Sequence, residues 1–228
     1  MQISEIYSSK QGEGKLTGQQ SVFVRTSGCN LRCDFCDTPY TSWNPEGQSI
    51  PVDEVVDKVQ SFDLRHVVIT GGEPMLSIEI ESLSKRIKMA DHHITIETAG
   101  TILRDVACDL MSISPKMSNS VPSLERAGRW AKKHDQNRIN TQVIRDLIDK
   151  YKYQLKFVVS NESDLPEIEM LCQTLGPVSQ ENVLLMPEGV DKKTLDERGR
   201  WLANVCEEKG YVFCPRMHIQ WYGNKRGT

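Results

Sequence analysis

The 228-residue sequence lacks several features that would each define a class of protein. It has no excess of basic residues, because its formal net charge is −3, and so it offers no basic field for a nucleic-acid backbone. No hydrophobic run approaches the length of a membrane span, and the chain does not open with a basic segment followed by an apolar stretch. We therefore expect a cytoplasmic protein that binds neither nucleic acid nor a membrane.

The cysteines do not have the pattern of a secreted protein. There are seven of them, and an odd number argues against a disulfide framework. In a reducing compartment clustered cysteines are more often metal ligands, whereas isolated ones usually behave as small buried hydrophobes. Hydrophobic residues make up 38% of the chain and charged residues 26%, so a sizeable core can form. We expect a single domain over residues 1–228.

Short β-branched segments alternate with amphipathic helical patterns along the chain, and some of these segments are continuously apolar, as in strands buried on both faces. The predicted strands are Ser21–Thr26, His66–Thr70, His93–Thr98, Leu110–Ser114, Tyr153–Val159, Asn182–Met186 and Tyr211–Cys214. Helical spacing is found over Val52–Val59, Ile78–Ile87, Thr141–Lys150, Leu165–Leu175 and Lys192–Lys209. This alternation predicts an α/β fold with a parallel sheet, and six or so units fit a partial, open TIM-like (β/α)6 barrel. The polar segment Ser118–Asn140 is predicted to be a long loop with an irregular helix.

Functional residues in barrels of this kind lie at the C-terminal ends of the strands. The unusual residues of this sequence have that placement. A cysteine cluster follows the first predicted strand, and Gly71-Gly72-Glu73-Pro74 follows the second. Glu97 ends the third strand, and Ser114-Pro115-Lys116 follows the fourth. The pattern predicts a single site at one end of the sheet.

Cys29, Cys33 and Cys36 have a C-x3-C-x2-C spacing, in the segment Cys-Asn-Leu-Arg-Cys-Asp-Phe-Cys. Thiolates are the ligands of iron–sulfur clusters, and four are needed to saturate a cubane. Three close cysteines can therefore hold three irons and leave the fourth open. The alternative is a structural zinc site, which needs a fourth Cys or His. None of the five histidines lies close in sequence, although folding could bring one in.

The cysteine spacing, with Phe35 before the third cysteine and Gly-Gly-Glu after the next strand, resembles that of the radical S-adenosylmethionine (SAM) superfamily. The resemblance implies a [4Fe-4S] cluster, SAM bound at its open iron, and cleavage of SAM to a 5′-deoxyadenosyl radical. The SAM contacts that it implies come from Phe35, Cys36, Asp37, Gly72, Glu73, Ser114, Pro115 and Lys116. Gln154 and Lys156, on the fifth predicted strand, are weaker candidates. For Lys156 the alternative is a solvated charge beside a buried strand.

A second set of motifs lies near the two ends of the chain and comprises Gln11-Gly12-Glu13-Gly14, Arg25, Asp37-Thr38, His218, Trp221-Tyr222-Gly223 and Asn224-Lys225-Arg226-Gly227. Together with the cysteines, this set resembles the 7-carboxy-7-deazaguanine synthase family, which rearranges 6-carboxy-5,6,7,8-tetrahydropterin with loss of ammonia. The resemblance implies substrate contacts from Lys10, Gln11, Gly12, Glu13, Arg25, Thr70 and His218. The planar fork of Arg25 suits a substrate carboxylate. Thr38 corresponds to the Mg²⁺-binding position, and Glu97 is a candidate for placing SAM or substrate.

The same resemblance implies a homodimer, a small flavodoxin-like electron donor, and a place in 7-deazapurine (queuosine-type) biosynthesis. Two alternatives remain open at this point. One is an activating enzyme that installs a glycyl radical on a large partner protein, since such enzymes share the cysteine spacing. The other is a non-catalytic iron–sulfur electron carrier or zinc-binding adaptor, which would hold a fully ligated metal and have no affinity for SAM.

Overall fold

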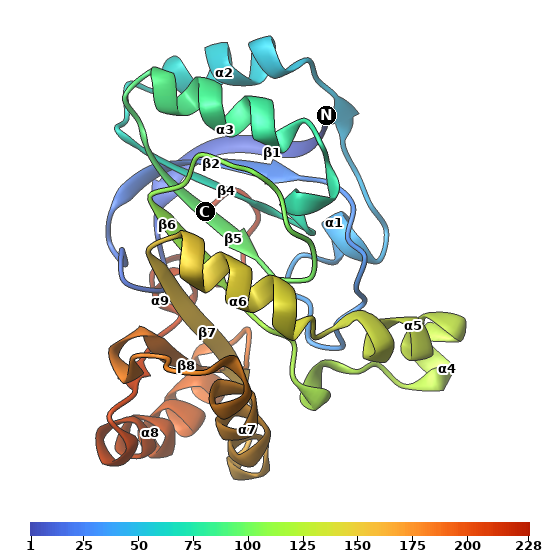
Figure 1. The fold of residues 1–228 in the computed structure, drawn as a ribbon, viewed down its shortest axis with the longest axis vertical. Helices are drawn as coiled ribbons and strands as arrows, with labels where there is room; N and C mark the ends of the chain where they lie inside the picture. The colour runs from blue at the N-terminus through green and yellow to red at the C-terminus, as the bar shows by residue number, and fades with distance from the viewer.

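Parallel pairing organises most of the nine-stranded sheet in the computed structural model, which describes residues 1–228 (Figure 1). The strand order is β3-β1-β2-β4-β5-β6-β7-β8-β9. The strands are β1 (Gln2–Lys10), β2 (Gln20–Thr26), β3 (Gln48–Ser49), β4 (His66–Gly71), β5 (His93–Thr98), β6 (Leu110–Ile113), β7 (Tyr153–Val159), β8 (Val183–Pro187) and β9 (Val212–Phe213). Every neighbouring pair from β2 to β9 is parallel, and only β1 pairs antiparallel with β2 and β3. The two end strands do not pair with each other, so the barrel is open, as predicted.

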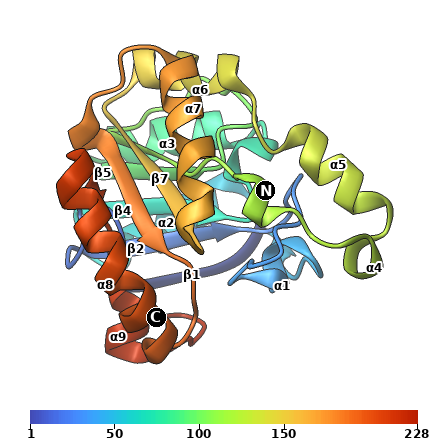
Figure 2. The same cartoon turned by 90° about the horizontal axis from the view of Figure 1, so that it is seen from below.

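Helices cover one face of the curved sheet (Figures 1 and 2). In chain order the α-helices are α1 (Pro39–Ser42), α2 (Val52–Gln60), α3 (Ile80–Met89), α4 (Leu124–Ala127), α5 (Arg129–Asn137), α6 (Thr141–Lys150), α7 (Leu165–Leu175), α8 (Lys192–Lys209) and α9 (Met217–Tyr222). Of these, α2, α3, α6, α7 and α8 contribute residues to the main core. Each long helix buries one apolar side, as Val55, Val56 and Val59 do in α2. Several helices begin with a side-chain cap. At the start of α6, for example, the side chain of Asn140 accepts a hydrogen bond from the amide of Val143.

Alternation along the parallel strands separates a structural face from a functional face. In β4, Val67 and Ile69 belong to the main core under the helices, whereas Val68 and Thr70 face the inside of the barrel. The same period of two runs through the other strands, because successive side chains of a strand point to opposite sides. Many of the inward positions near the C-terminal ends of the strands are polar, and they include Arg25, Thr70, Glu97, Ser112, Ser114 and Lys156.

Two details of the predicted fold are corrected. β1 is an additional strand that pairs antiparallel with β2. The sequence does not predict it, because a strand near the edge of the sheet can have a polar sequence without a continuous apolar run. Residues 118–140 contain two helices, α4 and α5, rather than a loop with one irregular helix. The prediction missed this because Gly128 separates the two short helices with a positive φ of 53°. The connection from β5 to β6 has no helix.

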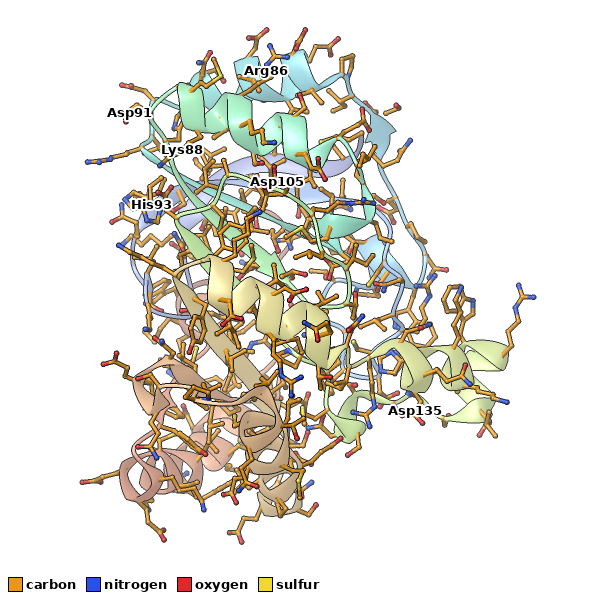
Figure 3. All side chains as sticks on the ribbon, viewed as in Figure 1. Arg86, Lys88, Asp91, His93, Asp105 and Asp135 are labelled. Atoms are coloured by element: carbon orange, nitrogen blue, oxygen red, sulfur yellow. The ribbon has the colours of Figure 1, made fainter.

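The outer surface of the helices carries paired charges. Asp105, in the β5–β6 connection, binds Lys85 of α3 at 2.9 Å and Lys150 of α6 at 2.6 Å. Figure 3 shows labelled charged side chains, among them Arg86 and Lys88, at the outside of the molecule. None of the helices combines the length and the hydrophobicity that crossing a bilayer requires. On α8, Leu202 is fully buried, and Trp201 packs against the same core.

Candidate active site

A cavity of about 540 Å³ occupies the inside of the barrel at the C-terminal ends of the parallel strands. This volume is within the range that small-molecule and cofactor sites usually have. Of the predicted site residues, those that line it are Lys10, Gln11, Gly12, Glu13, Arg25, Cys29, Cys33, Phe35, Cys36, Asp37, Thr38, Thr70, Gly72, Glu97, Ser114, Lys116, Lys156 and His218. Residues far apart in sequence therefore converge on one site, as the placement after strand ends predicted.

Three predicted residues do not line the cavity. Pro115 is buried beside it, and Gln154 accepts a hydrogen bond from the amide of Lys15 at 2.9 Å and donates one to Ser112 at 2.8 Å. Glu73 is buried, and its carboxylate accepts hydrogen bonds from the Thr98 hydroxyl and the Ala99 amide, both at 2.8 Å. In this structure Gln154 and Glu73 hold the rim of the cavity together rather than facing into it.

The three cysteines lie on the loop after β2, and all three are free thiols that face the cavity. Burial raises the pKa of Cys29 to about 12 and that of Cys33 to about 11, so both are neutral thiols at pH 7. The sulfur of Cys36 lies 3.2 Å from the hydroxyl of Ser42. Thiolate ligation at this loop must therefore be driven by the bound group itself, which releases the protons.

The Gly-Gly-Glu loop after β4 packs directly against the cysteine loop. A Cβ atom on Gly72 would lie 2.2 Å from the carbonyl oxygen of Gly28 and 2.7 Å from that of Thr41. The amide of Glu73 donates to the same Gly28 carbonyl at 2.9 Å. Only glycine permits this approach, which brings the two loops into contact beside the first cysteine.

A buried network of charged side chains crosses the mouth of the barrel. Lys156 Nζ on β7 lies 2.5 Å from Glu13 Oε2 and 3.3 Å from Glu97 Oε1. Glu97 also accepts a hydrogen bond from the hydroxyl of Thr70 at 2.8 Å. Burial alone would raise the pKa of Glu13, but the attraction of Lys156 and then of Arg216 outweighs it and holds this pKa well below its usual value. The side chain of Lys156 is only 6% exposed, which excludes the alternative of a solvated charge.

Arg216 is a buried member of the network that the sequence analysis did not identify. Its Nε donates to Glu13 Oε1 at 3.0 Å, its Nη1 donates to the Gly189 carbonyl at 2.6 Å, and its Nη2 pairs with Asp37. It thus joins three loops, one of which carries the cysteines. Its position in the sequence could have identified it, because Arg216 follows β9 just as the predicted site residues follow the earlier strands.

Arg25 projects from β2 into the cavity, and two groups of its guanidinium form hydrogen bonds within the protein. Its Nε donates to Glu5 at 2.7 Å and its Nη2 donates to the hydroxyl of Tyr7 at 2.6 Å. Burial tends to lower the pKa of Arg25, but Tyr7, Tyr40 and Glu5 raise it overall, so the side chain stays charged. The guanidinium has further N–H groups, which remain for an anionic ligand.

The C-terminal segment closes one side of the cavity. The amide of Met217 donates to the Gly12 carbonyl at 2.8 Å, and a Cβ on Gly12 would collide with His218 at 2.5 Å. His218 lines the cavity, and burial lowers its pKa, so it is neutral at pH 7. Residues 224–228 also reach the cavity. Lys10 lies at its edge with its ammonium 5.8 Å from the ring of Trp221.

An open (β/α) barrel with three cysteines at its mouth defines a class of enzyme, and comparison with known proteins identifies the same class. Residues 23–153 match the family model of the radical SAM superfamily. The chain is 45% identical to a 7-carboxy-7-deazaguanine synthase of Rhodopirellula baltica, over 99% of this chain and 88% of that one. It is 46% identical to the synthase of Halobacterium salinarum, over 95% of this chain and 88% of that one. The chain belongs to the 7-carboxy-7-deazaguanine synthase family of radical SAM enzymes.

The crystal structure of QueE from Escherichia coli has the same fold. It superposes with a TM-score of 0.74, with 21% sequence identity, and covers 95% of this chain and 94% of that one. The predicted partial barrel is therefore confirmed both by the strand order and by a solved structure.

The residues present fit the cluster and SAM that the superfamily uses. The family match favours this cluster over the structural zinc site. Thiolates are the ligands of iron–sulfur clusters, and four of them would saturate a four-iron cluster. Cys29, Cys33 and Cys36 share the cavity without a fourth cysteine, which suits a cluster with one open iron.

The buried ion-pair network around Glu13 is expected to stabilise the folded protein. Replacing Glu13 by Gln leaves Lys156 and Arg216 each with one charged partner fewer, and we expect the free energy of unfolding to fall by about 3 kcal/mol at pH 7. Because the folded pKa of Glu13 is depressed, its contribution is present above its ordinary pKa of 4.5 and is lost as the pH falls through the lower folded value. Urea unfolding of both proteins between pH 7 and pH 3.5 measures this difference.

The control is Glu125→Gln, because Glu125 is exposed on α4 and its side chain makes none of the ion pairs in the structure. We expect it to change stability by less than about 0.5 kcal/mol. A Glu13→Gln protein as stable as the control at pH 7 would show that the network contributes nothing to folding.

Proposed function

We propose that the protein converts 6-carboxy-5,6,7,8-tetrahydropterin to 7-carboxy-7-deazaguanine with loss of ammonia, as a step in 7-deazapurine (queuosine-type) biosynthesis. The observation that carries the proposal is similarity over nearly the whole chain to enzymes named for this product, together with a cavity lined by the predicted cluster and substrate residues. The full-length similarity favours this function over the activation of a glycyl-radical enzyme. The class of the enzyme is that of a carbon–nitrogen lyase.

Three cysteines would hold the cluster, and SAM would occupy the part of the cavity lined by the cysteine loop and the Gly-Gly-Glu loop, near Phe35, Ser114 and Lys116. Together, the reduced cluster and SAM supply one-electron cleavage of a carbon–sulfur bond of SAM. Glu97, Lys156 and Arg216 line this space, and ion pairs to Glu13 and to each other hold Lys156, Glu97 and Arg216 in place along its wall.

The substrate side of the cavity is formed by β2 and by the two ends of the chain. The guanidinium of Arg25 would bind the substrate carboxylate, and Gln11, Gly12 and Glu13 would read the donors and acceptors of the pterin edge. Thr70 and His218 face the same space. Because His218 is neutral, it can either donate or accept a hydrogen bond to the pterin without adding charge.

Mg²⁺, the electron donor and the oligomeric state belong to the same proposal. Thr38 lines the cavity beside Cys36, so its hydroxyl could ligate Mg²⁺ with substrate oxygens and water completing the shell. A small flavodoxin-like protein would supply the electron. We also propose a homodimer, on the family resemblance alone.

Turnover under anaerobic conditions tests the function. The reconstituted protein is incubated with SAM, Mg²⁺, reductant and 6-carboxytetrahydropterin, and products are followed by mass spectrometry. We expect 7-carboxy-7-deazaguanine without net loss of SAM. Cys36→Ala should be inactive, while Cys172→Ala, on the outer helix α7, should remain active. Cleavage of SAM with the pterin untouched would contradict the substrate and would favour a protein partner.

Replacing Arg25 by Gln removes the charged fork that we assign to the substrate carboxylate. A hydrogen bond to a charged group contributes about 1.5–3 kcal/mol, so the KM for the carboxylated pterin should rise roughly 10- to 100-fold. Affinity for SAM, measured by calorimetry, should be unchanged. Arg65→Gln is the matched control, because exposed Arg65 lies at the opposite end of the sheet. An unchanged KM in Arg25→Gln would remove the residue from the substrate site.

A further inference from the structure

The loop that carries the three cysteines has few hydrogen bonds of its own. Residues 29–36 contain no helix or strand, and the one backbone–backbone hydrogen bond within them runs from the Cys36 amide to the Cys33 carbonyl at 3.3 Å. Backbone N–H groups that are withdrawn from water need a partner. A loop that has to present three thiols in one arrangement therefore depends on contacts from another part of the chain.

Residues 118–138 form a helical arm, containing α4 and α5, that stands out from the barrel beside α1 (Figures 1 and 2). The arm supplies partners for two backbone amides of the cysteine loop. The amide of Arg32 donates to Nδ1 of His134 at 3.0 Å, and the amide of Asp34 donates to the Ser120 carbonyl at 2.9 Å. These two amides flank the middle cysteine, so the arm holds the loop on both sides of its central thiol.

The hydrogen bonds of His134 define its tautomer. The imidazole is fully buried, and its Nδ1 has to accept because Arg32 offers an N–H group. Nε2 therefore carries the ring proton and donates to the Ser120 hydroxyl at 2.9 Å, and this hydroxyl donates to the Met117 carbonyl at 2.6 Å. Burial lowers the pKa of His134 to about 4, so the ring is neutral at pH 7, as an accepting Nδ1 requires.

This chain of hydrogen bonds ends on the loop after β6. Met117 is buried in the main core, and it directly follows Lys116, which lines the cavity. Arg138, at the end of α5, donates from Nη1 to the Lys116 carbonyl at 3.1 Å and so holds the same loop a second time. The ring of His134 is therefore anchored to the barrel on one side and to the cysteine loop on the other.

We propose that His134 is a positioning residue for the iron–sulfur cluster, which holds the Arg32 amide through Nδ1 and so fixes the path of the chain between Cys29 and Cys33. The inference rests on the cluster and SAM of the proposed function. His134 does not line the cavity, so it acts through the backbone of the loop rather than on a bound group. Hydrogen bonds that orient the ligands of a metal centre also tune its electronic properties and its affinity. The alternative is a buried histidine that only completes the packing between the arm and the barrel.

The test compares two amide substitutions that keep different parts of the imidazole. In His134→Asn the side-chain oxygen can take the position of Nδ1 and accept from Arg32, whereas in His134→Gln the amide lies at the position of Nε2 and the bond to Arg32 is lost. The matched control is His92→Gln, because buried His92 bonds to the Leu64 carbonyl at 3.0 Å at the opposite end of the sheet. Each protein is reconstituted anaerobically. Electron paramagnetic resonance of the reduced cluster is recorded with and without SAM, and calorimetry measures the affinity for SAM.

We expect His134→Gln to bind SAM about tenfold more weakly than the parent and to give altered g values once SAM is added. His134→Asn should match the parent in both readouts, and so should the His92→Gln control, although all three substitutions lower the melting temperature. Ser120→Ala keeps the ring but removes the hydroxyl that orients it, so it should weaken SAM binding in the same direction. This variant provides the test if the His134 variants do not fold.

SAM affinity and g values like those of the parent in His134→Gln, or in Ser120→Ala where the histidine variants do not fold, would overturn the proposal. Equal changes in His134→Asn and His134→Gln, or the same change in His92→Gln, would also overturn it, because they would mean a general loss of stability. These readouts need no pterin. A parent protein that binds SAM at its cluster but leaves the pterin unchanged would contradict the proposed reaction and leave the role of His134 standing, so the two failures can be told apart.

Discussion

Parallel strand pairing is the constraint on which the rest of the structure depends. It places the C-terminal ends of β2, β4, β5, β6, β7 and β8 on one rim, so that each loop after a strand delivers its side chains to the same space. The alternation of side chains then assigns apolar residues to the helix-covered core and polar residues to the cavity. A single strand therefore contributes to the core with one face and to the site with the other. In β7, Phe157 is in the core, whereas its neighbour Lys156 is in the site.

An open barrel lacks the hydrogen bonds that would close its last gap, and here buried ion pairs connect the segments across the mouth. Arg216 links the N-terminal loop through Glu13 to the cysteine loop through Asp37. Such a network is costly to desolvate, so it is stable only when each charge has partners. Glu13 lies between Lys156 and Arg216, which satisfies this condition. Since the same residues line the cavity, the geometry of the site and the integrity of the mouth are coupled.

Much of the site could be predicted from sequence, because its residues follow predicted strands at a diagnostic spacing. The cysteine triplet, Gly72, Glu97 and Lys156 all line the cavity at the C-terminal ends of the parallel strands. What escaped prediction depends on tertiary contacts. The polar strand β1 acquires its conformation from pairing with β2, and the arm of α4 and α5 from His134 and Ser120. Arg216 has no motif around it, and only the convergence of three loops gives it a role.

The central claim is that Cys29, Cys33 and Cys36 hold a cluster with one iron left for SAM. Electron paramagnetic resonance of the reduced, reconstituted protein, recorded with and without SAM, tests it most directly. We predict a four-iron signal whose g values shift when SAM is added, because a ligand on the open iron alters the electronic structure of the cluster. A spectrum that SAM leaves unchanged would mean a fully ligated metal centre and would contradict the account.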